Sequence, residues 1–330
     1  MMKVEEIRRG LWTFPIVLPD NPLKWLNCYV IKSEKGGRNL LIDTGFNRTE
    51  CQDALQEGMT CLGLEPEMTD VLFTHMHADH IGNAAFLQKM GCNLYMGEVD
   101  NSTLIRTYEI ENNPIYSRAL KEGIPESMMT AMVKDNPGTL YKAEPFEAFL
   151  LKDAQVLSYG EYSLECILTP GHTPGHLCLY DTKSKTMFLG DHVLFDITPN
   201  ICVWPELDDA LGSYMNSLER IYCYDVDYAL PAHRNQANTS MRMRIDQLLL
   251  HHHRRLSEAK KIIGDNPGIN AYQLAGLMTW KIRTKNWEEF PLGQKWFAFS
   301  EALAHLDHLV NKHRIEKTIT NGIASYRSIK

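Results

Sequence analysis

The residues with the clearest chemical potential lie in one short segment, residues 74–80, which reads Thr-His-Met-His-Ala-Asp-His. Four ligand-type side chains, His75, His77, Asp79 and His80, fall within six positions. Imidazole nitrogens and carboxylate oxygens are the ligands that zinc and similar divalent metals prefer. A single histidine beside a strand usually packs or hydrogen-bonds, but this density of ligands argues against that interpretation. The segment therefore predicts a metal site.

The local backbone expected around this segment divides its ligands into two pairs. An apolar run over residues 71–74 predicts a buried strand, and a helical pattern follows over 81–90. At a strand end, extended backbone sends His75 and His77 to the same side, whereas the turn into the helix carries Asp79 and His80. The segment thus offers two ligands to one point and two to a neighbouring point. Further ligands must come from elsewhere in the chain.

Three more ligand-type residues occur directly after predicted strands, where a turn can present a side chain to a shared cleft. We expect them to complete the metal centre together with the segment at 74–80. These residues and the strands before them are His172 after 163–168, Asp191 after 186–189 and His233 after 228–230.

The elements that must position these ligands form two β-rich halves that resemble each other weakly. Strand patterns over 10–17, 25–32 and 39–43 precede the segment, and others follow it from residue 155. Leu-Leu-Ile-Asp ending at Asp43 echoes Phe-Leu-Gly-Asp ending at Asp191. Two such halves packed face to face, with helices outside, place both aspartates on one rim.

Residues 98–150 interrupt the strand pattern with three helical segments separated by prolines. We expect this insertion to form a lid over one side of the cleft. Within it, Tyr108, Tyr116 and Arg118 are candidates for substrate contact. Trp204, which follows Asp191 closely, is a candidate for the wall of the substrate pocket.

The character of the sequence changes near residue 241, so we predict a catalytic domain over 1–240 and a C-terminal domain over 241–330. The second part contains three helix patterns and then a hairpin signal at Asn321-Gly322, the outline of a winged helix. Three consecutive histidines, 251–253, point about 100° apart on a helix and cannot share one ion, which predicts a solvated helix face.

The charge of the C-terminal part raises an alternative function. Residues 241–330 carry 15 Lys and Arg against 8 Asp and Glu, although the whole chain has a net charge of −7. A basic winged helix is suited to binding nucleic-acid phosphates. Its basic residues do not cluster on the expected recognition helix, however. We therefore favour packing against the catalytic domain, or a homodimer contact, over nucleic-acid binding.

Composition limits the protein class. The chain has 330 residues, 44% of them hydrophobic, which suffices for a large core. No apolar run approaches the length of a membrane span, and the N-terminus lacks the apolar core of a signal peptide. The eight cysteines include no Cys-x-x-Cys pair and are expected to be reduced thiols. These features favour a cytoplasmic protein.

The segment at 74–80 resembles the His-x-His-x-Asp-His signature of the metallo-β-lactamase superfamily. Asp43, the segment itself, His172, Asp191 and His233 occur in that family's order, over roughly residues 6–235. The resemblance implies an α/β fold, a four-layer αββα sandwich, here with a small helical, winged-helix-like C-terminal domain.

The resemblance also implies a ligand set and a reaction. Two divalent metals, expected to be zinc with iron or manganese as alternatives, would share a hydroxide that attacks a carbonyl group, with Asp79 orienting it. The expected enzyme is a hydrolase that cleaves a thioester, ester or lactone of a small molecule. The implied ligands are His75, His77 and His172 for one metal, Asp79, His80 and His233 for the second, Asp191 as the bridge, and Asp43 to fix a histidine ring.

Two observations bear on the branch of the superfamily. The Thr-Pro-Gly-His-Thr-Pro-Gly-His run at 169–176 is similar to glyoxalase II-type thioesterases and acyl-homoserine-lactone lactonases. The chain lacks the basic segment that holds glutathione in glyoxalase II, so a glutathione thioester is not the expected substrate. An alternative is a mononuclear iron enzyme of the persulfide dioxygenase type, with His75, His172 and Asp191 as ligands.

Overall fold

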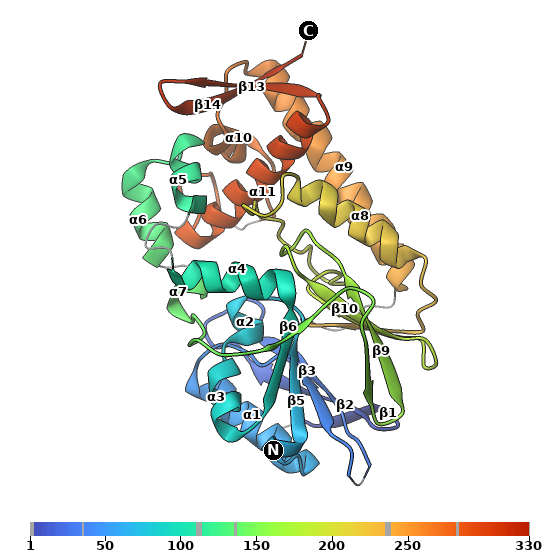
Figure 1. Cartoon of the computed structure of the whole chain (residues 1–330). Coiled ribbons are helices and arrows are strands. Elements are labelled where there is room, and N and C mark those ends of the chain that lie inside the picture. The colour runs from blue at the N-terminus through green and yellow to red at the C-terminus, as the bar shows by residue number, and fades with distance from the viewer. Residues whose placement is uncertain are drawn as a thin grey trace.

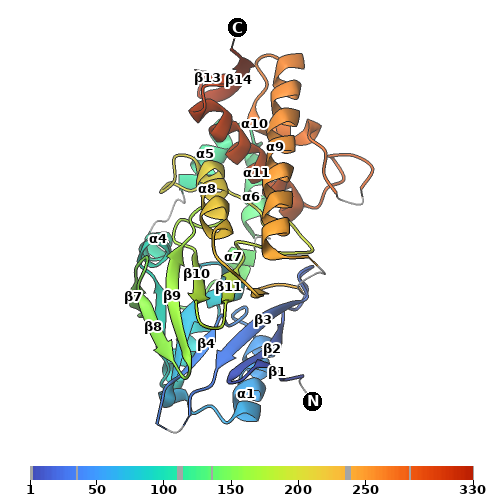
Figure 2. The same cartoon turned by 90° about the vertical axis from the view of Figure 1, so that its right-hand side faces the viewer.

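Two β-sheets lie face to face in the lower part of the molecule, and helices cover their outer faces (Figures 1 and 2). The structure is a computed structural model that describes residues 3–34, 36–109, 114–134, 137–234, 239–281 and 284–329. Within these ranges no helix is both long and apolar enough to cross a membrane. All eight cysteines are free thiols, as predicted.

The first sheet has seven strands in sequence order, antiparallel from β1 to β4 and parallel from β4 to β7. The carboxyl ends of parallel strands meet at one edge of a sheet, so the residues that follow β4, β5 and β6 come together there. The strands are β1 (Glu5–Arg8), β2 (Leu11–Val17), β3 (Trp25–Ile31), β4 (Asn39–Ile42), β5 (Thr69–Phe73), β6 (Asn93–Gly97) and β7 (Phe149–Leu151).

The second sheet has five strands in the order β12-β11-β10-β9-β8. Strands β11 and β12 are parallel, and β9 runs in the same direction because it and β11 are both antiparallel to β10. An isolated bridge between Leu26 and His233 connects the two sheets beside the ligand-bearing edge. The strands are β8 (Val156–Tyr159), β9 (Tyr162–Leu168), β10 (Leu177–Asp181), β11 (Thr186–Gly190) and β12 (Tyr228–Pro231).

Three apolar layers hold the sandwich together. Leu40 and Leu72 of the first sheet meet Leu164 and Phe188 of the second in a fully buried layer between the sheets. Helices α1 (Thr49–Leu62) and α3 (Ala84–Met90) bury the outer face of the first sheet, and α8 (Ala210–Tyr222) buries that of the second. The predicted αββα architecture is confirmed.

The insertion and the C-terminal part form the upper half of the molecule in Figure 1. Helices α5 and α6 of the insertion lie beside α11, whereas α4 packs against β6 and β7. The remaining helices and strands are α4 (Glu98–Glu109), α5 (Pro114–Lys121), α6 (Glu126–Lys134), α7 (Pro137–Leu140), α9 (Met241–Asp265), α10 (Ala271–Leu277), α11 (Leu292–Asn311), β13 (Ile315–Thr320) and β14 (Ile323–Ser328).

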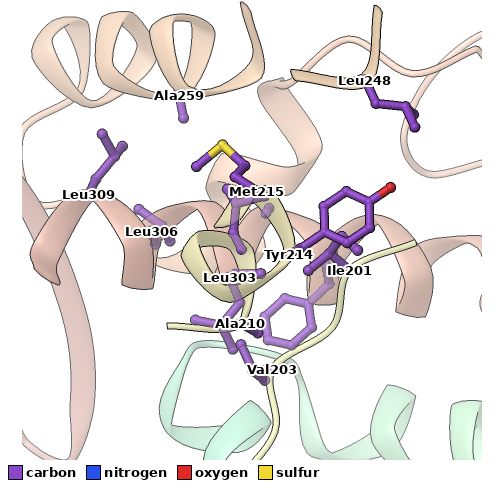
Figure 3. Packing of buried hydrophobic residues seen from close by; sticks show 14 of the residues in the cluster. Ile201, Val203, Ala210, Tyr214, Met215, Leu248, Ala259, Leu303, Leu306 and Leu309 are labelled. Carbon is purple, nitrogen blue, oxygen red and sulfur yellow. The ribbon is translucent and has the colours of Figure 1, made fainter. Parts of the chain in front are cut away.

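The C-terminal part shares its core with the second sheet. A single apolar cluster runs from β9, β10 and β11 through α8 to α9 and α11. Figure 3 shows Ile201 and Val203, from the segment between β11 and α8, beside Tyr214 of α8 and Leu303 of α11. The three helices and the hairpin match the predicted outline, while the domain boundary at residue 241 and the lid role of the insertion stay predictions.

The helix predicted over 81–90 is two helices, α2 (Ala78–Ile81) and α3. Gly82 lies so close to the backbone of Asn47 and Gly45 that a Cβ atom there would overlap it. The Asn83 side chain donates to the carbonyl oxygens at positions 44 and 46. This close packing interrupts the helix and anchors the ligand segment to the loop after β4.

The prediction of a solvated face at 251–253 is wrong for the middle histidine. His252 is fully buried, and its Nδ1 lies 3.3 Å from Nε2 of His305 on α11. Three consecutive histidines suggested an exposed helix face, but α9 packs against both α8 and α11, so little of its surface is left for solvent.

A buried carboxylate fastens the insertion to the C-terminal hairpin. Glu122, whose side chain is 2% exposed, accepts from Lys317 Nζ at 2.6 Å and from the Tyr326 hydroxyl at 2.8 Å. Arg118 lies nearby, with its Nε 3.9 Å from Glu122 Oε1. The insertion and the C-terminal hairpin, which are distant in sequence, therefore meet at one carboxylate.

Glu122→Ala is expected to destabilise the protein by about 3 kcal/mol, because it leaves a buried hydroxyl and an ammonium group without their acceptor. Urea denaturation followed by circular dichroism measures this loss. Glu316→Ala is the matched control, since it removes an exposed ion pair with Arg327 on the same hairpin and should cost less than about 1 kcal/mol. Equal losses in both variants would contradict the prediction.

Candidate metal centre

The structure brings all seven predicted ligands together at one edge of the sandwich. They form three overlapping groups, and within each group the ligand atoms lie within 4.8 Å of one another. The groups are His75, His77 and His172; His75, His80 and Asp191; and Asp79, His80 and His233.

Each candidate ligand lies shortly beyond the carboxyl end of a strand, in a loop or, for Asp79 and His80, in the short helix α2. The segment at 74–80 follows β5 of the first sheet, and His172, Asp191 and His233 follow β9, β11 and β12 of the second. Because the sheets face each other and these strands end at the same edge, the loops converge without a contribution from the strands' interiors. The centre therefore lies between the two halves.

Three imidazoles are oriented by hydrogen bonds from their Nδ1 atoms. His80 Nδ1 lies 2.9 Å from Asp43 Oδ2, His172 Nδ1 lies 2.9 Å from the Asn200 carbonyl oxygen, and His233 Nδ1 lies 3.1 Å from that of Trp25. An acceptor at Nδ1 assigns the proton to that nitrogen and leaves a lone pair on Nε2.

The Nε2 atoms of these three rings are buried and, like Oδ1 of Asp191, make no well-formed hydrogen bond with the described residues, although His233 Nε2 lies 3.3 Å from Asp79 Oδ2. Buried polar atoms are nearly always satisfied, so several unpartnered nitrogen and oxygen atoms in one place call for a shared binding partner such as a metal ion. The residues present therefore fit a metal centre with nitrogen and carboxylate ligands.

His75 and His77 point different ring nitrogens at the centre. His75 Nε2 lies 3.0 Å from His77 Nδ1, while His75 Nδ1 lies 3.1 Å from Thr74 Oγ1. The two rings would thus offer Nε2 and Nδ1, respectively, to a shared ion.

The electrostatics of the centre keep one pair of ligands neutral and the carboxylates charged. Burial and neighbouring imidazoles lower the pKa of His75 well below its usual value and that of His77 to about 3. Burial opposes ionisation of Asp79, but His80 and His233 lower its pKa to about 2. Neutral imidazole and ionised carboxylate are the metal-binding forms of these groups.

His80 and His233 behave differently in the metal-free protein. Burial lowers the pKa of each ring, yet the surrounding carboxylates, Asp43 and Asp191 foremost among them, raise it above its usual value. Metal binding at these two nitrogens must therefore displace protons, which couples metal affinity to pH.

Asp43 and Asp191 do lie on one rim, as their echo in the sequence suggested. Both contact His80, Asp43 at Nδ1 and Asp191 Oδ1 at 3.7 Å from Nε2. Asp43 also accepts from the backbone N–H and the hydroxyl of Thr74, and its φ of 63° is uncommon for a residue other than glycine. His176 completes the rim, since its Nε2 accepts from the Asp191 N–H at 3.1 Å.

Asp100 is a residue of the site that sequence reasoning missed. Its buried carboxylate accepts from the Met76 N–H at 3.0 Å, the Thr173 hydroxyl at 2.7 Å and the Gly175 N–H at 2.5 Å. It thereby ties the ligand segment after β5 to the loop that carries His172. The only sequence signal is its position just after β6, the next parallel strand.

Trp204 is the one substrate-contact candidate that the structure places beside the centre. Its ring lies 6.1 Å from that of His77, and its Nε1 donates to the His172 carbonyl oxygen at 3.1 Å. The side chain is only partly buried. Its role as a pocket wall stays a prediction.

The other three candidates have structural partners. The Tyr108 hydroxyl donates to a carbonyl oxygen at 2.9 Å, and the Tyr116 ring packs edge-on against Trp296. Arg118 forms an ion pair with Asp307 of α11 at 2.6 Å. These contacts explain the three residues without a substrate.

A family model described as the metallo-beta-lactamase superfamily matches residues 26–91 and 160–233. The matched stretches contain every residue of the three ligand groups and also Asp43. The region from 92 to 159, which includes the whole insertion, and the C-terminal helices lie outside the match.

Curated relatives are similar to the chain at low identity. An uncharacterized protein of Aquifex aeolicus is 24% identical over 53% of this chain and 68% of its own length. An atrochrysone carboxyl ACP thioesterase of Aspergillus novofumigatus is 24% identical over 66% of the chain, and a lactamase-like protein of Aspergillus niger is 25% identical over 70%. The chain spans 52% and 58% of the lengths of these two fungal proteins.

Solved structures share the fold along nearly the whole chain. A metallo-beta-lactamase family protein of Thermus thermophilus superposes with a TM-score of 0.82 at 24% identity, covering 98% of this chain and all of its own. A beta-lactamase domain protein of Burkholderia ambifaria gives a TM-score of 0.80 at 23% identity, with 99% and 94% covered. The arrangement that includes the C-terminal helices is therefore shared with other proteins.

Asp100→Asn is expected to destabilise the protein by about 3 kcal/mol, since an amide group turns one donor toward the N–H groups that the carboxylate now accepts. A thermal melt of the metal-free protein checks this. Asp153→Asn serves as the control, because Asp153 also accepts a backbone N–H, from Leu168, but at an exposed position. A melting temperature lowered no more by Asp100→Asn than by the control would refute the role of Asp100.

Proposed function

The chain belongs to the metallo-β-lactamase superfamily, and from this premise we propose that it is a hydrolase with two divalent metal ions, most simply zinc. His75, His77 and His172 would hold one ion and Asp79, His80 and His233 the other, with Asp191 between them. The proposed reaction is hydrolysis of a thioester, ester or lactone of a small molecule.

One observation carries the proposal: the buried Nε2 atoms of His80, His172 and His233 converge on the Asp191 carboxylate, whose Oδ1 also lacks a hydrogen-bond partner among the described residues. The group of Asp79, His80 and His233 offers three candidate ligands, as does the group of His75, His77 and His172. This supports two ions over the mononuclear iron alternative, which would leave Asp79, His80 and His233 without a function.

The chain's own residues define how such a centre would act. Bound divalent metals supply a hydroxide at neutral pH and polarise a carbonyl oxygen. Asp79 stays ionised because of its low pKa and is partly exposed at the edge of the cluster, so its carboxylate can accept a hydrogen bond from the attacking group and orient it. Trp204 beside His77 would position the acyl part of the substrate.

Among the proposed bonds, a thioester is favoured. Three of the fungal relatives carry the name of an acyl-carrier-protein thioesterase, and a metal-bound hydroxide suits acyl transfer to water. Since the chain spans only 39% to 54% of the lengths of those proteins, the nature of the acyl group and of its carrier is part of the proposal. Assignment to the glyoxalase II-like branch likewise stays a prediction.

Nucleic-acid binding receives no support from the C-terminal basic residues whose partners are described. Arg255 lies 3.4 Å from the Glu301 carboxylate, Lys317 contacts Glu122, and Arg327 pairs with Glu316. These cations are neutralised within the protein. A homodimer and a cytoplasmic location stay predictions.

The metal proposal makes a quantitative prediction for His77→Ala. The wild-type protein should bind two zinc ions per chain and hydrolyse a generic thioester, and prolonged dialysis against a chelator should remove both properties. His77→Ala should lower the hydrolysis rate by more than about 100-fold, because changes in residues that merely support a ligand already cost roughly 10–100-fold. Elemental analysis and a thiol-release assay measure the two quantities.

His253→Ala is the control for this experiment, since it removes an exposed histidine on α9. It should retain both zinc ions and full activity. One iron per chain in the wild-type protein would instead favour the mononuclear oxygenase. Full activity in His77→Ala would exclude the proposed mechanism.

Trp204→Ala tests the proposed pocket wall. Loss of an aromatic surface beside His77 should raise KM for an aromatic or long-chain acyl thioester by about 10-fold, the equivalent of one aromatic contact. The KM for an acetyl thioester should change much less. Steady-state kinetics with the two substrates separates these effects, and equal changes for both would rule out acyl recognition by Trp204.

A further inference from the structure

Residues 196–207, which form part of the connection between β11 and α8, contact the candidate ligand His172 at two points. The Asn200 carbonyl oxygen accepts from His172 Nδ1 at 2.9 Å. Four residues later, Trp204 Nε1 donates to the His172 carbonyl oxygen at 3.1 Å. The segment therefore fixes both the backbone and the ring of His172.

The same segment is fastened to the C-terminal helix α11. The Asn200 side chain donates through Nδ2 to the Phe297 carbonyl oxygen at 3.2 Å, and its Oδ1 accepts from Cys202 Sγ at 2.8 Å. Ile201 and Val203 pack into the apolar cluster around Tyr214 of α8 and Leu303 of α11 (Figure 3). Asn200 thus forms a hydrogen bond with His172 through its backbone carbonyl group and another with α11 through its side chain.

A carboxylate on α11 lies next to this link. Glu301 follows Phe297 by one helical turn. Burial raises the pKa of Glu301, while Arg255 and the side chain of Asn200 lower it. The Asn200 amide therefore lies between two acceptors of α11, the Phe297 carbonyl oxygen and the Glu301 carboxylate.

We propose that Asn200 is a positioning residue for His172, and that α11 thereby sets the metal affinity of the group formed by His75, His77 and His172. The inference rests on the proposed metal binding. An imidazole can rotate about its Cβ–Cγ bond, and the acceptor at Nδ1 decides where the Nε2 lone pair points. The acceptor for His172 is held in place by α11.

The other oriented rings lack this dependence. His80 is held by Asp43 and His233 by the Trp25 carbonyl oxygen, and both acceptors belong to the first sheet. A disturbance at α11 should therefore weaken one ligand group and spare the group of Asp79, His80 and His233. This selectivity separates positioning from a general loss of stability.

Two substitutions test the link. Asn200→Ala removes the side-chain bond to α11 and keeps the carbonyl group. Asn200→Asp has nearly the same shape but places a carboxylate against the Phe297 carbonyl oxygen and beside Glu301, which repels the segment from α11. Asn311→Ala is the matched control: Asn311 Nδ2 of α11 donates to the Asp208 carbonyl oxygen at 2.7 Å, the same type of bond outside the reach of His172.

The measurement is a titration of the metal-free full-length protein with zinc in competition with a chromophoric chelator. Wild-type protein and Asn311→Ala should each show two tight sites. Asn200→Ala and Asn200→Asp should show one site of wild-type affinity and one weakened by about 10-fold or more, within the range for residues that support a ligand. The visible spectrum of the cobalt-loaded protein should change for the weakened site only.

The outcomes are distinguishable. Wild-type protein that binds no zinc tightly would overturn the proposed function, and this inference with it. Two wild-type-like sites in both Asn200 variants would overturn the inference alone. So would equal weakening of both sites, or the same loss in Asn311→Ala. If Asn200→Asp fails to fold, Asn200→Ala decides between these results, since it introduces no charge.

Discussion

Each imidazole has two nitrogens. In the candidate centre, a hydrogen bond at Nδ1 orients the ring, and this orientation directs Nε2 toward the proposed metal. Asp43 and the carbonyl oxygens at positions 25 and 200 accept hydrogen bonds from the Nδ1 atoms of His80, His233 and His172, respectively. The three Nε2 atoms then face a small space in which they make no well-formed hydrogen bond with the described part of the chain. Without an electron-pair acceptor, this arrangement would leave buried polar atoms unsatisfied at considerable cost. The surrounding fold maintains it.

The sandwich satisfies this requirement by bringing strand ends together. The parallel strands of the first sheet deliver Asp43, the ligand segment and Asp100 to one edge, and β9, β11 and β12 deliver the remaining ligands from the opposite sheet. Asp100 then joins the two loops directly. The apolar layer between the sheets fixes the distance across which the ligands meet.

Much of this could be predicted because the ligands are locally dense or follow strands. The segment after β5, His172 and the two-sheet architecture all follow from residue type and periodicity. Asn200 and Asp100 could not be predicted, since one acts through a backbone carbonyl group and the other through backbone N–H groups, which carry no residue-type signal. The break at Gly82 and the burial of His252 depend on tertiary contacts that helical periodicity does not contain.

The apolar cluster that joins the second sheet to α9 and α11 has a consequence for how the molecule comes apart. Two bodies with separate cores can melt independently, but parts that share one core lose their packing together. The C-terminal helices therefore unfold cooperatively with the sheet that carries His172, Asp191 and His233. Such a chain offers no stable half-folded state in which a ligand-bearing loop is free while the rest of the sandwich persists.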